Sequence, residues 1–233
     1  MVGIIDYGVG NLFSLRSSFA AIGVEAFVSG DAAELAKADR LILPGVGAFG
    51  DARRKLADTG MDKLILEEAQ KGKPIMGICL GMQIAVIEFA RNVLGLKCAH
   101  SGEFDEQCAH KVIDFMPGQS EKIDKGGTLR LGSYPCSIKA GTKMEQCYGN
   151  ILIHERHRHR YEFNNKYREE LMRAGLVISG TSPDDRLVET VELKEHPFFV
   201  GVQFHPEFKS RPNQSHPLFK GFVSAALLKR NAD

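Results

Sequence analysis

The 233-residue chain contains no tryptophan, no run of about 18 apolar residues and almost no net charge (+1). The near-zero charge offers no field to attract nucleic acid or an acidic membrane, and the N-terminus lacks the layout of a signal peptide. The five cysteines are odd in number and form no C-x-x-C pair, so we expect neither a disulfide framework nor a metal site. With 43 % hydrophobic and 25 % charged residues, the chain fits a single domain over 1–233, in the reducing cytoplasm and with no membrane segment.

The most informative stretch is residues 74–83, Pro-Ile-Met-Gly-Ile-Cys-Leu-Gly-Met-Gln. A short apolar run typical of a buried parallel strand stops at Cys79, which has Gly77 and Gly81 two residues to either side. A helical pattern follows. This G-x-C-x-G layout predicts a nucleophile elbow, whose sharp turn needs small neighbours and places the cysteine at a helix N-terminus, where a thiolate is favoured. A buried structural cysteine after a strand is the alternative interpretation.

A second apolar strand is predicted at residues 200–204, and it ends in His205-Pro206-Glu207. One reactive cysteine with a distant histidine and acid is the pattern of cysteine hydrolases, because the fold brings the base to the nucleophile. Proline fixes the backbone between His205 and Glu207, so Glu207 can orient the imidazole while the ring faces Cys79. A lone histidine is more often structural, but the pairing with a cysteine elbow favours catalysis.

Together these two motifs resemble the class I glutamine amidotransferases. The resemblance implies a catalytic triad of Cys79, His205 and Glu207 that hydrolyses L-glutamine to L-glutamate and passes ammonia to a synthase partner. It implies no metal and no organic cofactor. It also agrees with the alternation of short apolar strands and helical segments, which predicts an α/β fold with a flavodoxin-like, doubly wound, mostly parallel sheet and flanking helices.

A glycine-rich segment, Pro-Gly-Val-Gly-Ala-Phe-Gly, follows the predicted strand 40–43. Its glycines let backbone amides turn toward a neighbouring site, although a plain loop would have the same composition. In the resemblance this is the oxyanion strand, and the N–H of Val46 or Gly47, with that of Leu80, would face the tetrahedral intermediate.

The resemblance also assigns five residues to the glutamine substrate. Glu103, within Ser-Gly-Glu-Phe-Asp at 101–105, suits the amino group, and Arg160 suits the α-carboxylate, which a guanidinium can grip with two hydrogen bonds. Gly45, Gln83 and Tyr161 complete the set.

Arg160 lies in a basic run, Glu-Arg-His-Arg-His-Arg-Tyr-Glu at 155–162. Alternation along a strand would put its three arginines on one face and His157 and His159 on the other. A nucleic-acid patch is conceivable but disfavoured, because the run is short and the net charge is near zero. We expect the other members of the run to be structural or to face a partner.

The remaining pattern is less specific. Gly8-x-Gly10 fails as a dinucleotide fingerprint because the third glycine position holds Phe13. We expect a single amphipathic helix over residues 51–70, a polar irregular stretch over 96–125 and a closing helix over 216–229.

More narrowly, the two parts of the chain resemble different amidotransferases. Residues 1 to about 75 are similar to the glutaminase subunit of imidazole glycerol phosphate synthase, through 6–12 (Asp-Tyr-Gly-Val-Gly-Asn-Leu) and 43–49 (Leu-Pro-Gly-Val-Gly-Ala-Phe). Residues from about 76 to 233 are similar to the glutaminase domain of CTP synthase, through 126–132 (Gly-Gly-Thr-Leu-Arg-Leu-Gly) and 204–212 (Phe-His-Pro-Glu-Phe-Lys-Ser-Arg-Pro). The chain is therefore interpreted as a composite, with a junction near 72–83 and a synthase partner of either type.

Two other functions stay open. The composite pattern allows a folded but latent or inactive interaction module that needs a partner, since a displacement of about 1 Å in an active site can cost on the order of 100-fold in rate. A γ-glutamyl hydrolase of similar fold is disfavoured by the match of residues 156–162 and 209–212 to the CTP synthase domain.

Overall fold

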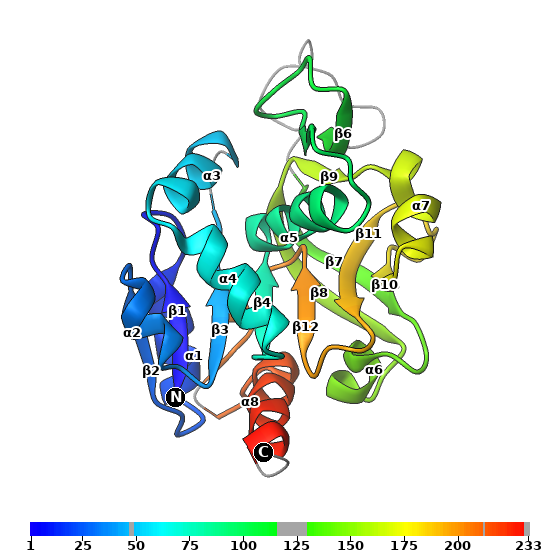
Figure 1. Ribbon diagram of the computed structural model, residues 1–233. Helices are drawn as coiled ribbons and strands as arrows, with labels where there is room; N and C mark the ends of the chain where they lie inside the picture. Colours follow the sequence, from blue (N-terminus) through cyan, green and yellow to red (C-terminus); the bar gives the residue numbers. More distant parts are fainter. Residues whose placement is uncertain (47–48, 116–129, 212, 231–233) are drawn as a thin grey trace.

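Figure 1 shows the computed structural model of the chain, which describes residues 1–46, 49–115, 130–211 and 213–230. Five parallel strands form one half of the main sheet, in the order β2 (Ala26–Ser29), β1 (Val2–Ile5), β3 (Arg40–Leu43), β4 (Ile75–Ile78) and β12 (Phe199–Val202). The two strands that carry the predicted catalytic motifs, β4 and β12, are direct neighbours in parallel register. The carboxyl ends of these strands therefore bring the two distant motifs to one edge of the sheet.

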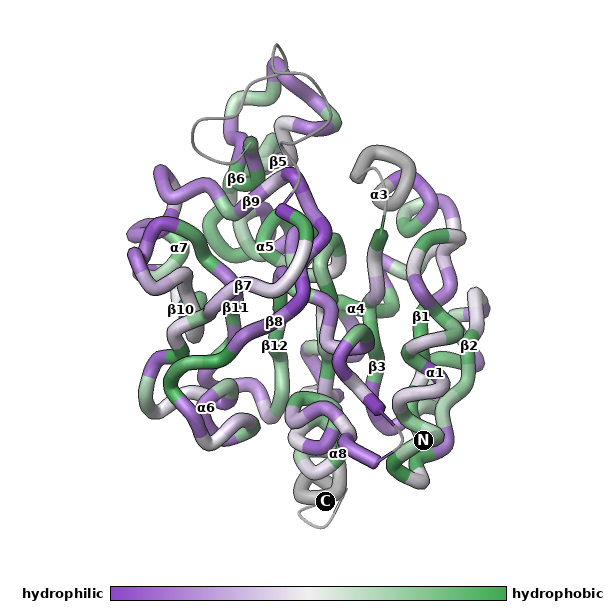
Figure 2. The backbone as a smooth tube through the Cα atoms, turned by 180° about the vertical axis from the view of Figure 1, so that it is seen from behind, coloured by the Kyte–Doolittle hydropathy of each residue, from purple (hydrophilic) through white to green (hydrophobic). Residues whose placement is uncertain are grey.

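Beyond β12 the sheet continues with antiparallel strands, in the order β11 (Val188–Leu193), β10 (Leu176–Thr181), β7 (Arg130–Ile138) and β8 (Leu152–His159). β8 pairs with β7 on one side, and it is the outermost strand of this sheet in the described structure. Figure 2 shows β8 as a largely hydrophilic strand, in contrast to the more apolar β12.

Helices cover both faces of the sheet (Figure 1). One face carries α2 (Ala32–Ala36), α3 (Phe49–Asp58), α4 (Met61–Gln70), α5 (Leu80–Asn92) and α7 (Arg168–Arg173). The other carries α1 (Leu12–Ala20), α6 (Lys143–Tyr148) and α8 (Pro217–Arg230). In β1, Val2 and Ile4 enter the core under α1 and α8, whereas Ile5 enters the opposite core. This alternation confirms the doubly wound α/β fold.

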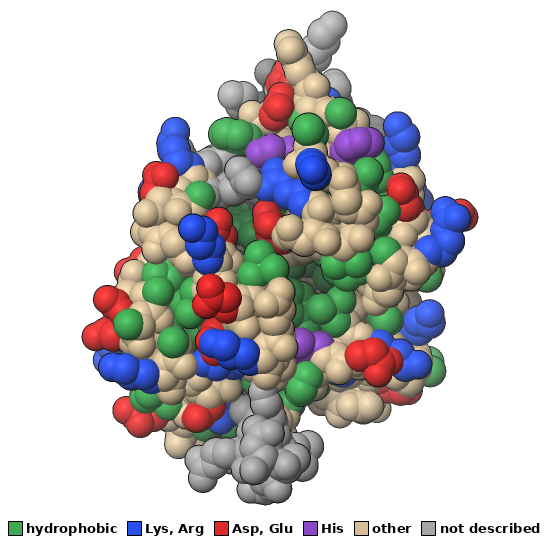
Figure 3. All heavy atoms as spheres, in the orientation of Figure 1, with side chains coloured by type: hydrophobic (Ala, Val, Ile, Leu, Met, Phe, Trp, Pro, Cys, Tyr) green, Lys and Arg blue, Asp and Glu red, His purple; other side chains and the backbone are tan. Residues whose placement is uncertain are grey.

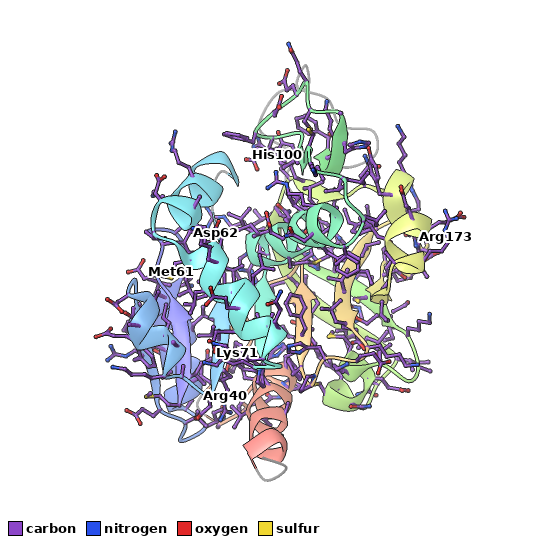
Figure 4. The ribbon with its side chains drawn as sticks, in the orientation of Figure 1. Arg40, Met61, Asp62, Lys71, His100 and Arg173 are labelled. Atoms are coloured by element: carbon purple, nitrogen blue, oxygen red, sulfur yellow. The ribbon has the colours of Figure 1, made fainter. Side chains whose placement is uncertain are left out.

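The helix expected over residues 51–70 is two helices, so that prediction is wrong. α3 ends at Asp58 and α4 starts at Met61, with Gly60 between them in the left-handed conformation (φ 70°). A helix cannot pass through this backbone conformation. Figure 4 labels Asp62 in the first turn of α4 and Lys71 just after its last turn, charges that complement the dipole of a separate helix.

The stretch expected to be irregular, 96–125, contains two strands, β5 (Ala99–Ser101) and β6 (His110–Phe115); residues 116–125 lie outside the described part of the chain. β6 pairs with β9 (Tyr161–Phe163), which lies about fifty residues later in the sequence, to form a separate three-stranded sheet. The hydrophobic pattern of the sequence did not predict these strands because β5 has only three residues, β6 mixes polar and apolar residues, and β9 is distant in sequence.

Two single-turn 3₁₀ helices complete the elements, η1 (Asn165–Tyr167) and η2 (Pro206–Phe208). The strand β8 follows the predicted alternation, because Arg156 and Arg158 are exposed while His157 and His159 are buried. No helix in the described ranges has the length and apolar character to cross a membrane.

Candidate active site

Cys79 occupies a sharp turn between β4 and α5. Its φ of 52° and ψ of −106° are unusual for a residue with a side chain, and its backbone N–H donates to the Val202 carbonyl at 2.7 Å. The flanking glycines are required by space: a Cβ at Gly77 would lie 2.9 Å from the Gly81 carbonyl carbon, and a Cβ at Gly81 would overlap the Leu43 carbonyl oxygen. The predicted elbow is therefore present as a turn, with the thiol at the N-terminus of a thirteen-residue helix.

His205 and Glu207 form a buried pair at the start of η2. The His205 Nδ1 and a Glu207 carboxylate oxygen are 2.9 Å apart, and the Phe208 ring stacks on the imidazole with centroids 4.9 Å apart. No described residue meets hydrogen-bond geometry at the other ring nitrogen, Nε2. Burial lowers the pKa of His205, but its interactions with the Cys79 sulfur and the Glu207 carboxylate outweigh burial and raise that pKa to about 10.

Cys79 opens into a cavity of about 840 Å³. Six other predicted site residues line this cavity: Val46, Leu80, Gln83, Glu103, Arg160 and Tyr161. These residues come from the β3–α3 loop, α5, the β5–β6 connection and the junction of β8 with β9, which lie far apart in sequence. Its wall also includes Gly10, Asn11, Arg158, His159 and Phe208, none of which was predicted to contact a substrate.

Three described residues of the predicted site do not line the cavity wall: His205 and Glu207, which are buried, and Gly45. Gly45 packs under α5, where an added Cβ would collide with the Leu80 side chain and lie 3.1 Å from the Tyr7 hydroxyl. Gly45 therefore allows the loop and the helix to approach closely. Gly47 lies outside the described residues.

Comparison with known proteins identifies this arrangement. The family model "Glutamine amidotransferase class-I" matches residues 3–225. The chain belongs to this family. Class I glutamine amidotransferases are glutaminases with a cysteine nucleophile, so the chain is an enzyme of that class.

Relatives of this amidotransferase include CTP synthases. It is 63 % identical over 157 residues to the CTP synthase of Moorella thermoacetica, covering 67 % of this chain and 29 % of the relative. It is 50 % identical over 213 residues to that of Bacillus subtilis, covering 90 % of this chain and 38 % of the relative. The chain thus spans about a third of the length of these relatives.

A solved structure of similar fold is the glutaminase domain of Trypanosoma brucei CTP synthase with bound acivicin. The two share 29 % sequence identity and a TM-score of 0.78, over 97 % of this chain and 93 % of that one. The expectation that the enzyme needs no metal stays a prediction. In the described part of the amidotransferase, no group of three His, Cys, Asp or Glu side chains could hold a metal ion.

Sequence reasoning missed Tyr7, which holds the candidate oxyanion loop. The buried Tyr7 hydroxyl donates to the Pro44 carbonyl at 2.5 Å, two residues before Val46. Burial and the nearby Cys79 raise the pKa of Tyr7 further above its usual value, so the hydroxyl keeps its proton. Tyr7 lies two residues after the end of β1, at the same sheet edge as Cys79. This position was the only feature of the sequence that could have placed Tyr7 near the site.

Sequence reasoning also missed Gln203, at the end of the strand that leads to His205. Its amide nitrogen lies 3.7 Å from the Cys79 sulfur, within hydrogen-bond range for sulfur, and its amide oxygen accepts from Gln83 Nε2 at 3.1 Å. Gln83 Nε2 also donates to the Tyr161 carbonyl at 3.0 Å. Two buried amides therefore connect the thiol to the backbone at the end of β8.

We expect Tyr7→Phe to lower kcat about 10-fold with little change in KM. Loss of the hydroxyl frees the Pro44 carbonyl and lets the Val46 N–H drift, and one complete oxyanion donor contributes about 10²–10³ in rate. Steady-state glutamate release measures both constants. Tyr148→Phe is the matched control, because it removes a hydroxyl bonded to buried Glu155 (2.9 Å) outside the cavity. Equal kcat in the two variants would contradict a role for Tyr7 in the oxyanion loop.

Proposed function

We propose that Cys79, His205 and Glu207 hydrolyse L-glutamine to L-glutamate and ammonia. The observation that carries the proposal is the position of Cys79: it stands in a strained turn at the N-terminus of α5, opens into the cavity that holds Glu103 and Arg160, and interacts with the buried His205–Glu207 pair. The elevated pKa of His205 supports an imidazolium beside a thiolate, which is the reactive form of a cysteine nucleophile.

In the proposed reaction the Cys79 thiolate attacks the carboxamide carbon of glutamine. The oxyanion of the tetrahedral intermediate is held by the N–H group of Leu80 and by that of Val46 or Gly47. His205 gives its proton to the departing nitrogen, which leaves as ammonia, and a glutamyl thioester remains. His205 then takes a proton from water, which attacks the thioester carbonyl, releases glutamate and restores the thiol. Glu207 keeps the proton on Nδ1 and so leaves Nε2 for the reaction.

Recognition of glutamine is assigned to charged groups on the cavity wall. Glu103 accepts the α-ammonium group and Arg160 binds the α-carboxylate, which are matched charges for an amino acid. Gln83 and Tyr161 line the same cavity as the nucleophile.

The ammonia acceptor is proposed to be a synthase of the CTP synthase type. The support is the 63 % identity to a CTP synthase over 157 residues, and this chain covers only 29 % of that relative. The narrower resemblance of residues 1–75 to the imidazole glycerol phosphate synthase subunit, and with it the composite origin, stays a prediction. An apolar cavity of about 380 Å³ lies between α4 and α5, against the sheet (Figure 3). It does not bear on the composite origin, because α4 and α5 directly precede and follow β4.

The test is release of glutamate and ammonia from L-glutamine by the purified chain. Equal amounts of the two products, with saturation by glutamine, are the expected result. Folded chain that releases neither product, even when a CTP synthase lacking its own glutaminase activity is added, would reject the proposal in favour of the inactive module. Activity that appears only with the added synthase would identify the latent form. If a γ-glutamyl peptide is hydrolysed faster than glutamine, the chain is instead a γ-glutamyl hydrolase.

A further inference from the structure

The inner face of β8 carries two buried histidines that the triad does not use, and one of them, His159, also lines the cavity wall. His157 Nδ1 and His159 Nε2 are 2.8 Å apart, so one nitrogen must carry a proton and the other must accept it. Burial lowers the pKa of both rings, that of His159 to about 3, and the Arg130 guanidinium nearby adds to the effect. Both rings are therefore neutral, and their hydrogen bond has a defined direction.

The Tyr161 carbonyl sets that direction. It lies 3.2 Å from His159 Nδ1, and a carbonyl oxygen can only accept, so Nδ1 carries the proton. A Glu162 carboxyl oxygen also lies 3.4 Å from the same nitrogen. The other nitrogen of His159, Nε2, must then accept the proton of His157 Nδ1.

The far end of the pair is anchored in the core. His157 Nε2 remains an acceptor and faces a Glu189 carboxyl oxygen at 3.6 Å, while Arg130 lies 2.5 Å from the other Glu189 oxygen. Burial raises the pKa of Glu189 to about 7, against the lowering effect of Arg130, and no described residue meets hydrogen-bond geometry at His157 Nε2, so the chain of hydrogen bonds ends at His157. The rings of Tyr134 and Phe204 meet the His157 ring edge-on, at centroid distances of 5.7 and 5.9 Å, and fix its plane.

The near end reaches the nucleophile. The Tyr161 carbonyl that accepts from His159 also accepts from Gln83 Nε2, and the same amide nitrogen donates to Gln203, whose own nitrogen lies beside the Cys79 sulfur. Both hydrogens of the Gln83 amide are thereby used. Any movement of the Tyr161 carbonyl must move Gln83 and Gln203.

We propose that His157 and His159 form a buried relay of hydrogen bonds that positions the Tyr161 carbonyl and, through Gln83 and Gln203, the Cys79 sulfur. The proposal rests on Cys79 being the nucleophile. The two histidines are positioning residues in this scheme: the proton stays within the relay, and its effect on the reaction is geometric.

The experiment compares His159→Asn with His159→Gln. An asparagine amide places its N–H near the position of Nδ1 and can still donate to the Tyr161 carbonyl, whereas a glutamine amide reaches the position of Nε2 and cannot. We expect kcat of His159→Asn to stay within about 3-fold of the parent. We expect kcat of His159→Gln to fall about 10- to 100-fold, the range for a displacement of about 1 Å in an active site, with KM little changed. Thermal stability should fall by a similar amount in both variants.

The matched controls are His154→Asn and His154→Gln. His154 lies on the exposed face of the same strand, outside the catalytic cavity, and these changes should leave both constants unaltered. If either His159 variant fails to fold, His157→Asn and His157→Gln make the same comparison at the other histidine. Only asparagine at position 157 can supply the N–H that His159 Nε2 accepts. Equal kcat within each pair of variants would overturn the relay and leave the histidines a structural role. Glutamate release that continues in Cys79→Ala would instead overturn the proposed nucleophile, so the two failures are distinguishable.

Discussion

Replacing Cys79 with alanine is expected to reduce glutamate release by at least about 10⁴-fold, because no other group in the described cavity can form the glutamyl thioester. Glutamine should still bind, since Glu103 and Arg160 are unchanged, and calorimetry can measure the Kd directly. A variant that binds glutamine but does not turn it over assigns the residue to the chemical step.

Two control variants accompany Cys79→Ala: one removes a different cysteine, and the other tests the backbone strain at Cys79. Exposed Cys98→Ala should keep full activity, which excludes a general effect of removing a thiol. Cys79→Gly should be as inactive as the alanine variant yet more stable than it, because glycine accepts the φ of 52° that costs other residues about 1–3 kcal/mol. Substantial glutamate release by Cys79→Ala would refute the assignment of the nucleophile.

Gly81→Ala is expected to destabilise the fold by about 3–5 kcal/mol, which places it among the most damaging single substitutions. The added Cβ would overlap the Leu43 carbonyl oxygen and lie 3.0 Å from its carbon, and both atoms belong to the backbone of a buried parallel strand. Neither α5 nor β3 can move away without breaking the sheet register or the turn at Cys79. The higher helix propensity of alanine, about 1 kcal/mol, cannot offset this overlap.

Thermal unfolding measures this effect, and about 3–5 kcal/mol corresponds to a fall in Tm on the order of 10 °C for a chain of this length. Gly141→Ala is the matched control, because its added Cβ meets no atom within 4 Å. Its φ of 76° strains alanine, so this variant measures the cost of an unfavourable backbone conformation alone, about 1 kcal/mol. Equal losses of stability in the two variants would show that the turn at Gly81 can relax, against the expectation from the packing.

Local pattern was sufficient where an element is apolar and its ends are marked by glycine or proline. β3 and β4 were predicted to within a residue because each is a short buried run before a turn. The alternation along β8 was also predictable, since a strand has a side-chain period of two.

Prediction failed where long-range contacts override local pattern. Gly60 interrupts a sequence that otherwise has continuous helical spacing, and the sequence does not reveal that its backbone turns left-handed. β5 and β6 are short and polar, and they form strands because β9 pairs with β6 from about fifty residues away.

The sequence by itself indicated the chemistry of this protein: a cysteine between two glycines and a His-Pro-Glu strand end are properties of residue type and spacing, and Glu103 and Arg160 were added by the family resemblance. Only the tertiary structure decided how these groups are held. Tyr7, Gln203 and the two histidines of β8 are common polar residues with no distinguishing neighbours in sequence. Their roles arise because the fold brings strand ends that are distant in sequence to one region of the sheet, so that Gln203 reaches Cys79, 124 positions away, in a buried environment where polar groups must bond to one another.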